Sequence, residues 1–109
     1  MNNRTILDTV SFRKTLEKNL LKAENEVVIF SPFIKLKALE WLFYKIKRNV
    51  SVKIISRLSV IDILQKATDF EICQFALNKG WEIGLINNLH AKLYMIDTNK
   101  VLIGSNNLT

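Results

Sequence analysis

The residues best suited to chemistry lie near the C-terminal end of the chain, where His90 and Lys92 stand two residues apart within an apolar run. Side chains alternate between the two faces of a β-strand, so an imidazole and an ammonium at this spacing point to the same side. Burying both groups on an apolar face costs free energy unless an anion compensates for them. A phosphate group would use both, so the pair predicts a phosphate-binding site.

A second polar group, Gly104-Ser105-Asn106-Asn107, follows the next strand-like run, and turn residues from Asp97 to Lys100 separate the two runs. This arrangement predicts an antiparallel hairpin. In such a hairpin Gly104 lets the backbones approach closely, while Ser105 and Asn107 can donate hydrogen bonds to phosphate oxygens. Asp97, at the turn itself, is expected to tie the hairpin together rather than to join the chemistry.

Together these residues resemble the HxK(x)4D(x)6GSxN motif of the phospholipase D superfamily, and every specified position of that motif matches. The βα units before the motif look like the N-terminal part of the same family's fold, so the resemblance covers essentially the whole chain. It implies that His90 attacks phosphorus and forms a phosphohistidine, with Lys92 and Asn107 binding the phosphate oxygens and Ser105 assisting. It implies no metal ion and no other cofactor.

In this family a second copy of the motif faces the first, and its histidine protonates the leaving oxygen. This chain contains one histidine. The resemblance therefore implies a homodimer formed through the motif face, with two His90 side chains opposed. Family domains continue past the motif, with an acidic residue that orients the histidine, whereas this sequence ends at Thr109. We expect residues 1–109 to be a single phospholipase D-like domain and the N-terminal fragment of a longer protein.

Strands that alternate with helices are expected to position the motif. Apolar residues at helical spacing predict helices at about 11–25, 36–48 and 62–79, with Ser11 as a cap of the first and Cys73 as a core residue of the third. Strands are predicted at 27–30, 52–55 and 81–85, followed by a hairpin of 89–96 and 101–103. The expected fold class is α/β: a mixed, mainly parallel sheet with helices on both faces and a C-terminal antiparallel hairpin that carries the motif.

Ser31 and Arg57 follow the first two predicted strands, at the carboxyl edge where open α/β sheets bind ligands. Both are candidate substrate-binding residues, although a surface role for Arg57 explains its position equally well. Trp41, Tyr44 and Trp81 could stack on bases, but packing in the core or at its rim is the favoured interpretation.

The chain carries a formal net charge of +6, and most of the excess lies between Lys35 and Lys53, where Glu40 is the one acidic residue. A polyanion such as DNA explains this bias, and a solvated helix face explains it equally well. A single cysteine fits a reducing compartment, and neither a signal peptide nor an apolar run long enough to cross a bilayer is present. These features predict a cytoplasmic protein without a membrane partner.

The leading functional hypothesis is a metal-independent phosphodiesterase that acts on DNA, similar to the nuclease and restriction-endonuclease branch of the superfamily. A phospholipid phosphodiesterase or phosphatidyltransferase is the second hypothesis, disfavoured by the lack of a surface helix suited to membranes. The third is a catalytically silent module for DNA binding or dimerisation.

Overall fold

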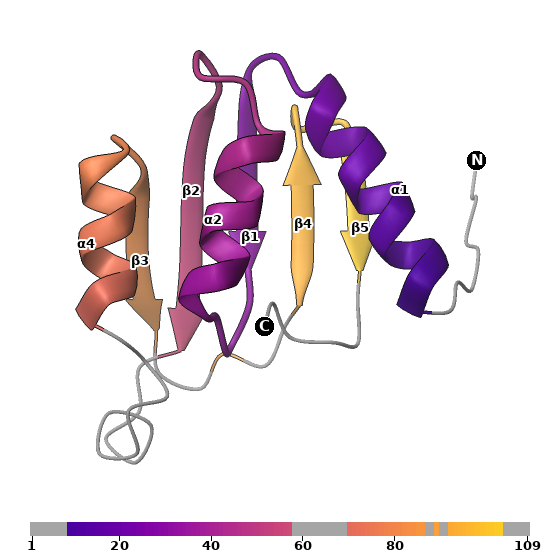
Figure 1. The fold of residues 1–109 in the computed structure, drawn as a ribbon. Helices are drawn as coiled ribbons and strands as arrows, with labels where there is room; N and C mark the ends of the chain where they lie inside the picture. Colours follow the sequence, from indigo (N-terminus) through magenta and orange to yellow (C-terminus); the bar gives the residue numbers. More distant parts are fainter. Residues whose placement is uncertain (1–8, 58–69, 87–88, 90–91, 104–109) are drawn as a thin grey trace.

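The computed structural model describes residues 9–57, 70–86, 89 and 92–103 (Figure 1). Along the chain its elements are α1 (Thr9–Lys22), β1 (Glu26–Phe30), α2 (Leu36–Lys45), β2 (Ser51–Arg57), α4 (Phe70–Asn78), β3 (Glu82–Ile86), β4 (Leu93–Ile96) and β5 (Lys100–Ile103). Ser11, the expected helix cap, lies inside α1. The expected helix at 36–48 is shorter, because the backbone at Ile46 is already extended.

The five strands form one mixed sheet in the order β3-β2-β1-β4-β5. The β3-β2-β1 strands pair in parallel, and β4 joins the edge of β1 in the antiparallel direction. β5 then pairs with β4 as an antiparallel hairpin, with Leu93 opposite Ile103. The predicted class, a mixed α/β sheet that ends in an antiparallel hairpin, is confirmed.

The expectation of helices on both faces needs a correction for the residues that the structure describes. Helices α1, α2 and α4 lie side by side over the same face of the sheet (Figure 1). The chain moves outward in one direction from β1 to β2 to β3, and right-handed crossovers that progress in one direction put their helices on one side. A helix on the other face requires a reversal of strand order, which these crossovers do not contain.

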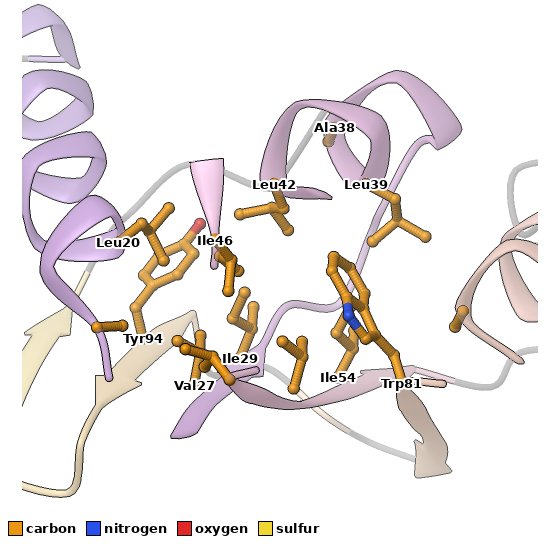
Figure 2. Packing of buried hydrophobic residues seen from close by; sticks show 14 of the residues in the cluster. Leu20, Val27, Ile29, Ala38, Leu39, Leu42, Ile46, Ile54, Trp81 and Tyr94 are labelled. Atoms are coloured by element: carbon orange, nitrogen blue, oxygen red, sulfur yellow. The ribbon is translucent and has the colours of Figure 1, made fainter. Parts of the chain in front are cut away.

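The core fills the space between this helical layer and the sheet (Figure 2). Alternate residues of the strands point into it, among them Ile29, Ile54 and Tyr94, each of them almost completely buried. Leu20 of α1 and Leu42 of α2 close the core from above. Trp81, just before β3, is also buried, so core packing is the correct interpretation of that residue.

Helix α4 packs with a different stripe from the one expected. The sequence predicted that Cys73 faces the core, but Cys73 is only partly buried, and Leu77, four residues later on the same stripe, is 67% exposed. Ile72 and Ala76 are the buried residues instead. Both pairs have the spacing of one helix face, so periodicity alone could not choose between them.

The face of the sheet opposite the helices carries apolar side chains beside the ion pair of Lys53 with Glu82. Strand alternation puts Val28, Ile55 and Met95 on this side, and Ile103 at its margin is 75% exposed. None of the described helices covers this surface, which we call the open face.

Candidate active site

The two strands that carry the motif meet the parallel strands at one edge of the sheet. Leu93, the first residue of β4, pairs with Phe30 at the end of β1 and with Ile103 at the end of β5. Phe30 in turn pairs with Ile55 near the end of β2. The carboxyl ends of β1, β2 and β5 therefore lie beside the start of β4, and we call this the carboxyl edge.

Lys92 is partly buried and directly precedes β4, so it lies at the carboxyl edge. His90, Gly104, Ser105 and Asn107 lie outside the described residues. The topology nevertheless brings the chain into β4 and out of β5 at the same edge, one residue before Gly104. That the two parts of the motif form one site stays a prediction.

Ser31 lies at this edge within a tight connection between β1 and α2. Its side chain is fully buried, and its hydroxyl donates a hydrogen bond to the carbonyl oxygen of Phe33 at 3.0 Å. Its backbone N–H donates to Ile55 at 2.9 Å, and the hydroxyl of Ser56 donates to the carbonyl of Pro32 at 3.2 Å. These bonds fasten the connection to β2, and substrate contact by Ser31 stays a prediction.

Arg57 ends β2 at the same edge. Its guanidinium carbon lies 4.5 Å from the centre of the Phe33 ring, close enough for a cation–π interaction that limits where the side chain can go. The contact between Arg57 and the Phe33 ring was not predicted from the sequence. Arg57 is thus a cation held at the expected edge, and its contact with a substrate stays a prediction.

Asp97 lies at the opposite end of the hairpin from Lys92, beyond the four residues of β4. Its carboxylate accepts hydrogen bonds from the backbone N–H groups of Glu24 at 3.0 Å, Asn25 at 2.7 Å and Glu26 at 3.0 Å. These bonds lower the pKa of Asp97, because they favour the charged form. Asp97 therefore fastens the hairpin to the start of β1, a role broader than the expected bond within the hairpin.

The backbone of this turn has an unusual conformation. Both Asp97, with φ 54°, and Thr98, with φ 59°, are left-handed. The N–H of Asn99 donates to the carbonyl of Ile96 at 3.3 Å and closes the turn. Three residues, 97–99, therefore connect the paired residues Ile96 and Lys100.

Within the described ranges no three His, Cys, Asp or Glu side chains gather as a metal-binding group. Among the same residues, no helix has the length and apolar character needed to span a membrane.

The family model described as the phospholipase D-like domain of cardiolipin synthase matches residues 16–109 of this chain. A search of curated proteins finds no match.

Solved structures share the fold at low sequence identity. NucT from Helicobacter pylori matches with a TM-score of 0.67 and 16% identity, over 92% of this chain and 69% of that protein. The archaeal chromatin protein TrmBL2, whose structure shows a mode of DNA binding, matches with a TM-score of 0.60 and 20% identity, over 85% of this chain. A mutant of yeast tyrosyl-DNA phosphodiesterase matches with a TM-score of 0.54 and 18% identity, over 94% of this chain.

The chain spans about a third of the length of TrmBL2, of which 35% is covered, and 27% of the yeast enzyme.

Proposed function

Because this chain belongs to the phospholipase D superfamily, we propose that it is a phosphodiesterase that cleaves DNA without a metal ion, with His90 as the nucleophile. The observation that supports this most directly is the convergence of the motif strands. β4 begins and β5 ends at the carboxyl edge, and Lys92 lies at that edge. Lys92 is thus near Ile103, the last described residue of the chain before Gly104.

In the proposed reaction an imidazole nitrogen of His90 attacks phosphorus, and the bond between phosphorus and the leaving oxygen breaks. Lys92 and Asn107, assisted by Ser105, bind the non-bridging oxygens and stabilise the charge that develops in the transition state. The leaving oxygen takes a proton from a second histidine. Water then hydrolyses the phosphohistidine and releases the free enzyme.

The second histidine has to come from another copy of the motif, because residues 1–109 contain one histidine, and a second copy of this chain is the simplest source. We propose a homodimer whose two-fold axis passes between the two motif faces, so that each His90 serves as nucleophile or as acid. We propose that the protein acts in the cytoplasm, where a single cysteine stays reduced.

The charge of the chain favours DNA as the substrate. A net charge of +6 on 109 residues attracts a polyanion, and each neutralised phosphate releases counterions. The description of the matching family model names cardiolipin synthase, so phosphatidyl transfer or phospholipid hydrolysis is the second candidate. TrmBL2 is described as a chromatin protein, which keeps a silent DNA-binding module as the third.

The test is nicking of supercoiled plasmid in excess chelator, with three variants. His90→Ala is expected to remove all nicking, and Lys92→Ala to lower kcat by about 10²- to 10³-fold, as for loss of a group that stabilises transition-state charge. Lys100→Ala is the matched control, since Lys100 pairs with Ile96 at the opposite end of the hairpin. It should leave the rate unchanged.

The other outcomes decide between the candidates. Cleavage that disappears with chelator would contradict the histidine mechanism. Hydrolysis of phosphatidyl lipids with intact plasmid would favour the lipid enzyme. Inactivity on both substrates, together with salt-sensitive DNA binding, would favour the silent module.

A further inference from the structure

Cations on the helical layer are held in place by aromatic rings. The guanidinium carbon of Arg13 on α1 lies 4.7 Å from the centre of the Trp41 ring on α2. Lys45 lies 5.9 Å from the same ring, but it also pairs with Glu17 at 2.8 Å, which offsets its charge. Arg13 is thus a cation that a tryptophan fixes beside α2.

A second ring holds two further cations at the other side of α2. The guanidinium carbon of Arg48 lies 3.7 Å from the centre of the Phe43 ring, and the ammonium of Lys79 lies 4.5 Å from it. Arg48 also donates hydrogen bonds to the carbonyl oxygens of Phe43 and Ile46, so it caps the end of α2 as well.

An exposed tyrosine stands between these two groups. Tyr44 is 77% exposed, so it contributes little to the core. Its ring is positioned by an edge contact with Phe43, with centroids 6.0 Å apart. Because Ala38, Leu39 and Leu42 face the core, helical spacing puts the exposed residues Lys37, Glu40 and Tyr44 on the outer stripe of α2, and the partly buried Trp41 flanks this stripe. One face of the Tyr44 ring is therefore a platform without an evident role in packing.

The formal positive charge is concentrated in the segments that contain α1 and α2. Residues 9–25 and 31–50 hold nine Lys and Arg residues against three Glu, a net charge of +6. That equals the net charge of the whole chain, so the other residues contribute none in sum. Helices α1 and α2, together with their connections, are therefore the basic part of the chain.

We propose that this surface, formed by Arg13, Lys37, Trp41, Tyr44 and Arg48 and called here the α1–α2 surface, binds single-stranded DNA. The cations would lie against successive phosphates, and an unpaired base would stack on Tyr44. A duplex offers no free base face inside its length, so the exposed ring favours a single strand. Side chains that are already held against aromatic rings, such as Arg13 and Arg48, lose less conformational entropy when they bind phosphate than freely moving side chains do.

The position of α2 gives this binding a consequence for cleavage. Five residues separate the end of β1 from the start of α2 at the carboxyl edge, and α2 runs back along the sheet for ten residues, about 15 Å (Figure 1). A DNA strand bound along α2 would therefore lead to the carboxyl edge, where the candidate active site is proposed. This consequence rests on the proposed function, whereas the binding itself does not.

The test measures binding of a fluorescein-labelled single-stranded oligonucleotide by anisotropy, with the His90→Ala protein so that cleavage cannot interfere. Tyr44→Ala is expected to weaken binding about ten-fold, as for loss of one stacked base, while Tyr44→Phe keeps the ring and should retain affinity. Lys37→Ala should weaken binding a few-fold and reduce the salt slope by about 0.7, the value for one phosphate contact on a single strand. Lys100→Ala on the hairpin should change neither.

Three results would overturn the proposal: unchanged affinity of Tyr44→Ala, equal binding of a duplex of the same length, or Tyr44-dependent binding to phosphatidylglycerol vesicles in place of DNA. Plasmid nicking by the protein with native His90 separates this proposal from the proposed function. Tyr44-dependent binding without nicking sustains the α1–α2 surface alone. Nicking with Tyr44-independent binding sustains the enzyme alone.

Discussion

Asp97 brings together two segments that are far apart along the chain, and it does so with a single charged group. Its carboxylate accepts three backbone N–H groups from residues 24–26, more than seventy residues earlier. Residues 24–26 lead from α1 into β1, and without Asp97 their N–H groups would have to form hydrogen bonds with water. The bonds are charge-assisted, so their strength depends on the ionised form of Asp97.

Asp97→Asn is therefore expected to destabilise the fold at neutral pH and to flatten its acid dependence. The pKa of Asp97 is lowered in the folded state, so the unfolded chain binds more protons in acid. Its contribution is complete above the unfolded pKa, about 3.9, and is lost as pH falls through the lower folded value. Urea unfolding at pH 7 and at pH 3, followed by circular dichroism, measures both effects.

The direction in which the stability difference changes with pH tests the role of the Asp97 charge. The variant and the native protein should differ most at pH 7, and the difference should shrink as the pH falls towards the lowered pKa of Asp97, because protonation removes the charge of the carboxylate. A difference that grows on acidification would contradict the role of the charge. Lys100→Ala, on the same hairpin, is the control and should follow the native curve.

At the residue scale, the sequence contains the local part of the site prediction but not the contacts that support it. The pairing of His90 with Lys92 uses only the alternation of side chains on a strand, and of these two residues the structure describes Lys92, at the carboxyl edge. The three donors to Asp97 could not be predicted, because the partners are separated by most of the chain and only the pairing of β1 with β4 brings them together. The stacking of Arg57 on Phe33 depends on tertiary structure in the same way.

At the element scale, helix α4 is followed by Gly80, whose backbone has a left-handed conformation. Gly80 has φ 76°, and its N–H donates to the carbonyl of Leu77 at 3.1 Å. A Cβ added there would meet no heavy atom within 4 Å. Any cost of a side chain at this position is therefore conformational rather than steric.

Gly80→Ala is expected to lower the free energy of unfolding by about 1–2 kcal/mol, the cost of the left-handed conformation for an ordinary residue. Gly80→Asn should lose less, because asparagine tolerates this conformation better. Gly84→Ala is the matched control: its new Cβ would lie 3.8 Å from Ile55, an ordinary contact, and little change is expected. Urea unfolding measures both variants. Equal losses of unfolding free energy in Gly80→Ala and Gly84→Ala would contradict a cost that comes from the left-handed backbone of Gly80.

The elements themselves were predicted well where their signal is local. Val27 to Phe30 and the hairpin could be read from apolar runs and turn residues, and both are present. The orientation of α4 could not, since Cys73 with Leu77 and Ile72 with Ala76 offer equivalent stripes. The position of the three described helices on one face depends on strand order, which periodicity along the chain does not encode.

At the scale of the whole molecule, two surfaces could bring two copies together. One is the motif face at the carboxyl edge, which would complete a site that needs two histidines. The other is the open face, where Val28, Ile55 and Met95 form an apolar surface that none of the described helices covers. Apolar surfaces of this kind are common at protein interfaces, so a dimer by itself does not identify which one is used.

Mixing native protein with His90→Ala protein distinguishes the two. If subunits are exchanged by unfolding and refolding together, a site shared across the motif face loses activity whenever either copy lacks His90. With equal amounts of the two proteins and the total protein concentration held constant, about a quarter of the activity of pure native protein should then remain, because only dimers of two native copies are active. A dimer through the open face keeps each site within one copy, and about half should remain. A quadratic dependence on the native fraction therefore supports the shared site, whereas a linear one contradicts it even if sedimentation shows a dimer.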